Sequence, residues 1–472
     1  MASIKAYARY LPCAFTLLRP ITFPERIAAR LVWNPSFVQP ERLSEWLVFL
    51  ENLHPKGEAG IELGLERVRK VAEVLGQQPF CPIFTIAGTN GKGSTAAYLE
   101  SILNRAGVRV GCYASPHLLR YNERVRVQGE PVADALLCAA FAKVEAARRQ
   151  AGEVFLSYFE FGTLAAWEVF AAARCEALVL EVGMGGRLDA VNLYDSDVAL
   201  VTTVDLDHQD WLGQDREAIG FEKAGIFRAG RPALCGDADP PKSLMEHAES
   251  LGASLRIIGR DFGFLKDDED GNRLQWRYWR KTGETVQRRT LAYPGLRGAA
   301  QLKNAALALA ALDAVRERLP VSMQAIREGL MQISLPGRFQ VLPGLPAIVL
   351  DVAHNPQAAR VLAENLSSMG FFGKTHAVLG MLSDKDVEGC IAALRGKISR
   401  WFLASLEGAR GLSAEALAAR LQGAAPDASY ACHTNPEAAF AAAREVARES
   451  DRILVFGSFY TVSAVLRALG RA

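Results

Sequence analysis

The chain has 472 residues, of which 50% are hydrophobic and 22% charged, and its formal net charge is +2. This length exceeds the size at which a single hydrophobic core stops growing, so two or three domains are expected. No run of lysine and arginine is dense enough to follow a phosphate backbone, which argues against nucleic-acid binding. No apolar stretch reaches the roughly 18 residues of a membrane span, and the eight scattered cysteines fit reduced thiols in a cytoplasmic protein.

The first forty residues have an unusual charge pattern. Five basic residues face a single acid, namely Lys5, Arg9, Arg19, Arg26 and Arg30 against Glu25. An organellar presequence is basic in this way. The interpretation we favour is an N-terminal extension over residues 1–40 that is poorly ordered, with the folded chain beginning at residue 41.

From residue 83 onward, short β-branched runs alternate with helical stretches rich in alanine and leucine. This alternation predicts a parallel sheet covered by helices. Strands are expected at 83–87, 108–113, 177–182 and 198–204, and the last two are interpreted as sheet centres hidden on both faces.

The sequence pattern changes between residues 266 and 290, where polar and aromatic residues alternate. Turn-forming residues at 267–272 predict an antiparallel hairpin, solvated and lying against one sheet edge. The cluster of Trp276, Tyr278 and Trp279 with neighbouring basic residues could mimic a nucleic-acid face, and we regard the hairpin as the better interpretation.

A helix over 301–318 leads into residues 335–346, which are rich in proline and glycine and are predicted to be the interdomain linker. Beyond it the alternation restarts. Strands are expected at 348–351, 376–379, near 401 and at 453–456, with helices from 356, 386 and 413 and at the C-terminus. The predicted fold class is α/β: a P-loop-type, mostly parallel sheet domain with a small antiparallel β element over 41–335, then a Rossmann-like α/β domain over 336–472.

A glycine-rich turn between the first predicted strand and the following helix has the composition of a phosphate-binding loop. It comprises Gly88, Thr89, Asn90, Gly91, Lys92, Gly93 and Ser94. Backbone N–H groups and the helix N-terminus can cradle phosphate oxygens there, with Lys92 reaching the β- and γ-phosphates and Ser94 approaching Mg²⁺. The loop departs from the usual spacing and carries an additional Gly93, so a tight turn without a ligand stays the alternative.

Polar residues follow several of the predicted strands. Glu181 ends a buried strand at the edge where α/β sheets bind ligands, and a bound cation would explain a carboxylate there. The alternative is a carboxylate held by Arg187 or by backbone N–H groups. His208 and Ser115 end two other strands, so both are expected at the same edge. Lys223, near a predicted helix end, has the position of a surface cation or of a partner for the C-terminal end of the helix dipole.

These segments together resemble the Mur ligase superfamily, and within it the folylpolyglutamate synthase family, whose bacterial forms include bifunctional enzymes that also make dihydrofolate. The resemblance runs from about Leu43 to the C-terminus. Its most specific pieces are His54–Gly57 with 61–68, Thr89–Ser94, Ser115–Leu118, Tyr158–Thr163, Glu181–Asp189 and Asp207-His208. The unusual phosphate loop is the form found in this family.

The resemblance implies an ATP-dependent amide ligase that adds L-glutamate to dihydropteroate and to reduced folates through an acyl phosphate. A monofunctional folylpolyglutamate synthase, another Mur-type amino-acid ligase and a non-enzymatic nucleotide switch stay open. It further implies an ATP-binding central domain over 41–335 and a glutamate-ligase domain over 336–472. The expected state is a cytoplasmic monomer with small-molecule substrates and no nucleic-acid or membrane partner.

The resemblance also implies residue roles. Catalytic roles fall to Lys92, His208 and a carbamylated Lys223. Two Mg²⁺ ions would be held by Ser94, Ser115, Glu181, His208 and the carbamylated Lys223, and K⁺ is a further candidate. Nucleotide contacts are implied for Thr89 to Ser94 and for Asn304, Arg338, Asp351, Val352, Ala353 and His354. The acceptor substrate would lie against His54, Pro55, Lys56, Gly57, Ser157, Tyr158, Phe159 and Leu188.

Overall fold

The computed structural model describes residues 39–54, 62–266 and 275–471. Residues 40–472 form one compact unit. The expected N-terminal extension lies almost entirely outside the described residues, as do Pro55, Lys56 and Gly57. No helix in the described ranges is long and apolar enough to cross a membrane.

An eight-stranded sheet organises the first half of this unit, with the strand order β4-β3-β2-β5-β1-β6-β7-β8. Its strands are β1 Ile83–Ala87, β2 Val110–Tyr113, β3 Val125–Val127, β4 Glu130–Pro131, β5 Ala177–Glu181, β6 Val198–Val201, β7 Pro232–Cys235 and β8 Ser254–Ile257. Neighbouring strands run parallel except at one edge, where β2 pairs antiparallel with β3, and β3 pairs antiparallel with β4. Every residue of β1, β2, β5 and β6 is buried, which confirms the strands expected from the four apolar runs.

Helices cover both faces of this sheet. They are α1 Leu43–Leu53, α2 Glu66–Leu75, α3 Lys92–Arg105, α4 Asp134–Gln150, α5 Tyr158–Ala172, α6 Gln209–Leu212, α7 Arg216–Ala224, α8 Lys242–Leu251, α9 Ala299–Ala314 and α10 Met323–Gln332. Side chains alternate between the faces along β1. Ile83 packs with α4, α5 and α7, whereas Phe84 packs with α3 and α9.

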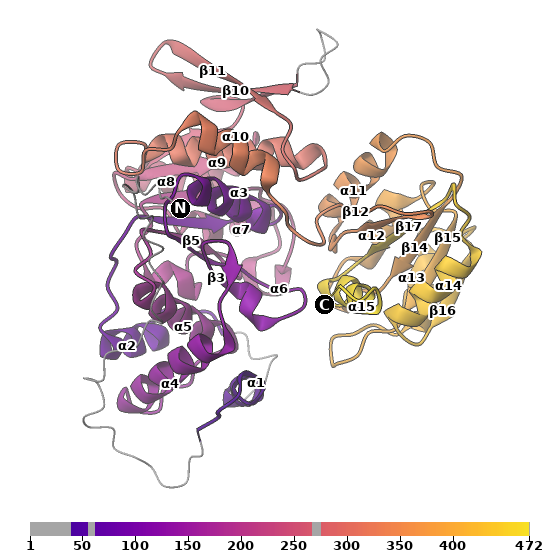
Figure 1. Cartoon of the computed structure of the whole chain (residues 1–472), viewed down its shortest axis with the longest axis horizontal. Coiled ribbons are helices and arrows are strands. Elements are labelled where there is room, and N and C mark those ends of the chain that lie inside the picture. The colour runs from indigo at the N-terminus through magenta and orange to yellow at the C-terminus, as the bar shows by residue number, and fades with distance from the viewer. Residues whose placement is uncertain (1–38, 55–61, 267–274, 472) are drawn as a thin grey trace, which may run out of the picture. The chain divides into compact units, whose positions relative to one another are not determined.

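A three-stranded antiparallel sheet follows, formed by β9 Phe262–Lys266, β10 Gln275–Thr282 and β11 Thr285–Ala292. Figure 1 shows β10 and β11 lying over α9 and α10. The expectation of a solvated hairpin at a sheet edge is wrong for one face, because Trp276 and Tyr278 are buried in the core that includes α9. The predicted turn at 267–272 lies outside the described residues, and a second turn joins β10 to β11.

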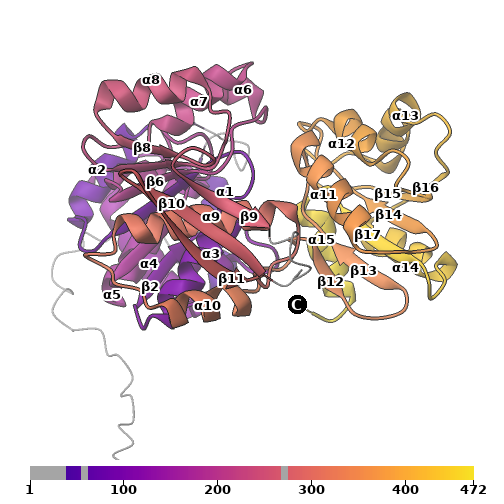
Figure 2. The same cartoon turned by 90° about the horizontal axis from the view of Figure 1, so that it is seen from above.

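The C-terminal half contains a six-stranded sheet in the order β12-β13-β17-β14-β15-β16. Its elements are β12 Gln340–Leu342, β13 Ala347–Leu350, α11 Pro356–Ser368, β14 Thr375–Leu379, α12 Val387–Leu394, β15 Arg400–Ala404, α13 Ala414–Ala424, β16 Tyr430–His433, α14 Pro436–Val446, β17 Arg452–Phe456 and α15 Phe459–Ala468. Helices α11, α12 and α13 cover one face, and α14 and α15 cover the other (Figure 2).

Two features of this half differ from the prediction. The expected linker 335–346 contains β12, which pairs antiparallel with β13 and so belongs to the sheet. Strand β16 and helix α14 were not expected. The predicted α/β class, with a parallel sheet, a small antiparallel element and a second α/β sheet, is confirmed.

Candidate active site

The carboxyl ends of β1, β5 and β6 open into one cavity of ≈ 940 Å³, counting its solvent-open part. Predicted site residues on its sheet side are Thr89, Asn90, Gly91, Lys92, Gly93, Ser115, Glu181, His208 and Lys223. Those on its C-terminal side are Arg338, Asp351, Val352, Ala353 and His354. Residues that lie up to 265 positions apart in the chain therefore meet, as the topology of parallel strands predicts.

A second cavity of ≈ 740 Å³ adjoins the first and holds the remaining expected nucleotide contacts, Ser94 and Asn304. Asn90, Arg338 and Asp351 line both cavities. The two hollows are thus continuous around the phosphate loop.

A Cβ atom would meet different surroundings at Gly91 and at Gly93 of the loop. Gly91 has φ +90° and precedes α3, and a Cβ there would lie 2.6 Å from Asn304 Oδ1. Gly93 approaches the site itself, because a Cβ there would lie 3.6 Å from Glu181 Oε2 and 3.7 Å from Arg338 Nη2. The additional glycine in the loop leaves room between an acid and a base.

No side chain caps the N-terminus of α3, so its first backbone N–H groups remain available to a ligand. Lys92 lies in the first turn and donates to Gly88 O at 2.9 Å and to Thr89 O at 3.4 Å. Burial lowers the pKa of Lys92, and Glu181 and Asp207 oppose that shift. The ammonium therefore lies where it can turn from backbone carbonyls toward an anion in the cavity.

Glu181 ends β5 and is 4% exposed. Its Oε2 accepts a hydrogen bond of 3.2 Å from Ser115 N–H. Burial raises the pKa of Glu181, and the neighbouring Lys92 and Arg338 counteract it. The alternative of a partnership with Arg187 is wrong, because Arg187 pairs with Glu222 at 2.7 Å.

His208 and Lys223 also line the larger cavity. His208 adopts a left-handed backbone conformation, φ 52° and ψ 40°, and burial lowers its pKa to about 4, so its ring is neutral at pH 7. Lys223, in the last turn of α7, is 3% exposed, so the expectation of a surface cation is wrong. Burial and the charge of Lys92 lower the pKa of Lys223 to about 7.

The donors expected for a metal are of mixed kinds. Within the described ranges no three His, Cys, Asp or Glu side chains are grouped as a metal cluster. The cavity instead offers the Ser115 hydroxyl, the Glu181 carboxylate and the neutral His208 ring, with Lys223 as a fourth donor only if its amine is converted to an anion. Hard oxygen donors suit Mg²⁺, and the Lys223 amine as it stands does not.

The C-terminal side supplies a buried cation with an unsatisfied nitrogen. Arg338 Nη1 is buried without a hydrogen-bond partner, and the guanidinium stacks on Phe459 with Cζ 5.1 Å from the ring centroid. Asp351 faces it and accepts backbone N–H groups from Phe339 at 2.9 Å and Ala353 at 2.8 Å. An anionic group in the cavity would satisfy the orphaned Arg338 nitrogen, so the site fits a phosphate.

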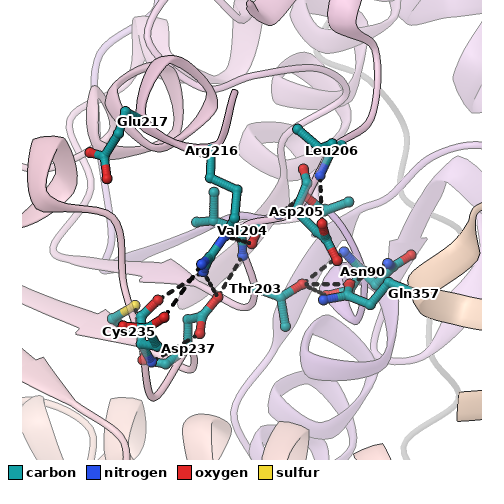
Figure 3. A network of polar contacts seen from close by, with 12 residues as sticks. Asn90, Thr203, Val204, Asp205, Leu206, Arg216, Glu217, Cys235, Asp237 and Gln357 are labelled. Atoms are coloured by element: carbon teal, nitrogen blue, oxygen red, sulfur yellow. Dashed lines mark hydrogen bonds and ion pairs between the residues drawn. The ribbon is translucent and has the colours of Figure 1, made fainter. Parts of the chain in front are cut away.

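Polar contacts tie the phosphate loop to α11. Asn90 Nδ2 donates to Gln357 Oε1 at 2.6 Å and to Asn355 Oδ1 at 3.1 Å. Figure 3 shows Asn90, Thr203 and Gln357 turned toward one another, with Arg216 bracing the end of β6 through Val204 O and Asp237. The loop is held from both halves of the unit.

The sequence prediction did not assign a site role to three residues in or around the cavity. They are Asp207, Gln357 and Lys385. Each follows the carboxyl end of a parallel strand, β6, β13 or β14, and that position is the signal that could have found them.

The expected acceptor residues that the structure describes, His54, Ser157, Tyr158, Phe159 and Leu188, are not among those that line the two cavities. The Phe159 ring packs against Gly183, which does line the larger one, and a Cβ on Gly183 would lie 2.8 Å from it. Ser157 accepts from Glu160 N–H and caps α5. Tyr158 meets Tyr121 edge to face, with centroids 5.8 Å apart.

Two further expected acceptor residues contact the 62–64 segment. His54 lies 3.3 Å from Glu62 Oε2. The carbonyl of Leu188 accepts from Gly64 N–H at 3.2 Å. These contacts bring the 62–64 segment beside the Glu181–Asp189 loop.

Comparisons with known proteins agree on one family. The Mur ligase middle domain model matches residues 86–312, and the Mur ligase, glutamate ligase domain model matches residues 337–459. The dihydrofolate synthase/folylpolyglutamate synthase of Escherichia coli (strain K12) is 45% identical over 430 residues, covering 90% of this chain and 95% of that protein.

Two solved structures are similar over nearly the whole chain. Escherichia coli FolC in complex with DHPP and ADP has a TM-score of 0.83 at 43% sequence identity, covering 92% of this chain and 98% of that one. A bifunctional folylpolyglutamate synthase/dihydrofolate synthase with Mn, AMPPNP and L-glutamate bound has a TM-score of 0.82 at 46% identity, covering 92% and 100%.

Proposed function

The chain belongs to the dihydrofolate synthase/folylpolyglutamate synthase family of Mur ligases, and from that premise we propose that it is an ATP-dependent amide ligase. It adds L-glutamate to dihydropteroate, forming dihydrofolate, and to reduced folates, forming folylpolyglutamates. We further propose that it works as a monomer.

The observation that carries this proposal is the meeting of Lys92, Glu181 and Arg338 around Gly93 in the larger cavity. Two cations and an acid around an uncapped helix N-terminus suit a transferring phosphoryl group and its counter-ion. A nucleotide switch would need the loop, but it would not need Glu181, His208 and Lys223 together.

Relatives bound to ADP or to AMPPNP with Mn support ATP and a divalent ion as the partners of this site. Ser94, Ser115, Glu181, His208 and a carbamylated Lys223 would hold two Mg²⁺ ions, and K⁺ is a further candidate. When bound, Mg²⁺ neutralises charge on the phosphates. Lys223 suits carbamylation because its buried, near-neutral amine has no side-chain hydrogen bond or ion pair among the described residues.

The chain's own residues position and neutralise the reactants. A carboxylate oxygen of the acceptor attacks the γ-phosphorus and ADP leaves, while Lys92 and Arg338 face the charge on the phosphoryl oxygens. The amine of glutamate then attacks the acyl carbon, the amine loses a proton and phosphate departs.

His354 donates through Nδ1 to Val352 O at 2.8 Å, so its Nε2 carries the free lone pair.

We propose that residues 41–335 and 336–472 act as separate domains and close over the reactants. The closure would exclude water, which would otherwise hydrolyse the acyl phosphate. The hydrogen bonds that Asn90 donates to Asn355 and Gln357 support this role, because they link the glutamate-ligase half directly to the phosphate loop.

An ADP-release assay with L-glutamate tests the function, with dihydropteroate and tetrahydrofolate as separate acceptors. ADP release is expected with each acceptor and is expected to require glutamate. Lys92→Met should abolish it, and Lys242→Met, an exposed lysine in α8, should not. Release with only one acceptor would remove the bifunctional assignment. ADP release with neither acceptor would overturn the assignment as a ligase.

A further inference from the structure

One arginine beside the larger cavity has no acid as partner. Arg124 ends the short 3-10 helix that begins at Tyr121, and its carbonyl accepts a hydrogen bond of 2.9 Å from Ala114 N–H. Ala114 is followed by Ser115 and Pro116, which line the cavity. Arg124 is therefore anchored directly behind the wall of the site.

Aromatic rings hold its guanidinium in place. Arg124 Cζ lies 5.4 Å from the centroid of the Tyr121 ring and 5.3 Å from that of the Tyr158 ring. Its Nε donates to His117 Nδ1 at 2.9 Å. Because a guanidinium only donates, this nitrogen of His117 is unprotonated and the contact brings no negative charge.

The nearby acid is already engaged. The Glu123 carboxylate accepts three backbone N–H groups, from Leu118 at 2.7 Å, Leu119 at 2.8 Å and Arg120 at 2.7 Å. In the part of the chain that the structure describes, Arg124 forms no ion pair, and its two terminal nitrogens make no hydrogen bond. A part-buried cation of this kind is normally paired with an anion.

We propose that Arg124 binds the α-carboxylate of a glutamyl acceptor, and so serves the folate acceptors but not dihydropteroate. This inference rests on the proposed function. A reduced folate ends in glutamate and has two carboxylates, one that reacts at the phosphate loop and one that does not. Dihydropteroate has only the reacting carboxylate.

The position of Arg124 favours the carboxylate that does not react. The reacting group must meet the phosphate beside Lys92 and Glu181, and Arg124 is not among the residues that line that cavity. The partly buried ring of Tyr158 beside it offers an apolar surface to the aromatic part of the same acceptor. A fixed guanidinium next to such rings suits a planar carboxylate.

The two acceptors provide a test within one enzyme. In Arg124→Met, which keeps the side-chain stem, KM for tetrahydrofolate should rise by about tenfold or more, as for a lost charge-assisted hydrogen bond. KM for dihydropteroate should change by less than about threefold, and Arg124→Lys should recover part of the loss. Arg120→Met is the matched control, because Arg120 is exposed and pairs with Asp134.

A change in the substrate probes the same contact. Tetrahydropteroyl-4-aminobutyrate keeps the reacting carboxylate and lacks the α-carboxylate, so wild type should bind it as weakly as Arg124→Met binds tetrahydrofolate. Equal losses for both acceptors, or none for either, would overturn the inference. If the wild type turned over neither acceptor, the proposed function would be wrong. Equilibrium dialysis tests the inference independently of turnover. If Arg124→Met left the affinity for tetrahydrofolate unchanged, the inference would be overturned.

Discussion

Lys385 and Asp207 form a buried ion pair between the two halves of the folded unit, with 2.8 Å between Nζ and Oδ1. Their side chains are only 7% and 11% exposed. Burial alone would raise the pKa of Asp207, but His208 and Lys385 outweigh it and hold that pKa well below its usual range. The glutamate-ligase half thereby contacts the residue immediately before His208.

Lys385→Met should weaken this connection. Removing one partner of a buried pair leaves the other charge uncompensated, at a cost of up to about 3 kcal/mol in the free energy of unfolding. Asp207→Asn in the same chain should recover part of that cost. Urea unfolding of the two single variants and the double variant measures the coupling, and strictly additive losses would show that the pair contributes nothing of its own.

The two loop glycines should respond differently to alanine. Gly91→Ala must adopt φ +90° and displace Asn304, a strain of about 1–3 kcal/mol, so ADP affinity should fall by about tenfold or more. Gly93→Ala places its Cβ at ordinary contact distance from Glu181 and Arg338 and should keep ADP affinity within about threefold. Titration calorimetry with ADP distinguishes the two, and equal losses would argue against the loop geometry described above.

Carbamylation of Lys223 predicts a chemical rescue. Lys223→Ala should be inactive, because the site loses an anion, and a short carboxylic acid such as acetate should restore part of the activity. Carbon-13 NMR of the wild type under labelled CO₂ should show a carbamate signal that Lys223→Ala lacks. A fully active Lys223→Ala would remove the lysine from the mechanism.

His354 should make stability depend on pH. Burial, followed by the charge of Lys385, lowers its pKa to about 4, below the unfolded value of about 6.5. The stabilisation by the neutral ring is therefore fully present above pH 6.5 and is lost as the pH falls toward 4. Between pH 7 and pH 5 the wild type should lose about 1–2 kcal/mol more than His354→Asn. Urea unfolding at the two pH values measures the difference. If the wild type and His354→Asn lost equal amounts of unfolding free energy, His354 would titrate normally.

Local patterns were sufficient for much of the fold and for one edge of the site. The strands β1, β5 and β6 are mostly apolar and wholly buried, and polar residues at or beyond their ends, such as Glu181 and His208, had to meet where parallel strands end. Lys223 was misjudged from position alone, since the turn of α7 that buries it is fixed by tertiary packing.

The missed elements depend on long-range pairing. Strand β12 has three residues among prolines and glycines, and only its pairing with β13 makes it a strand. Strand β16 lies at the edge of its sheet, is only half-buried and lacks an apolar run. The pairing of Lys385 with Asp207 gives no local signal either, because the two residues are 178 positions apart.

Transfer of a labelled oxygen tests the central claim, that this site phosphorylates a carboxylate. Dihydropteroate carrying oxygen-18 in its carboxylate should be turned over with ATP and glutamate, and the phosphate released should be examined by mass spectrometry. An acyl phosphate intermediate predicts one labelled oxygen in each phosphate, and no labelled phosphate from Lys92→Met. Unlabelled phosphate formed at the rate of amide synthesis would contradict the account.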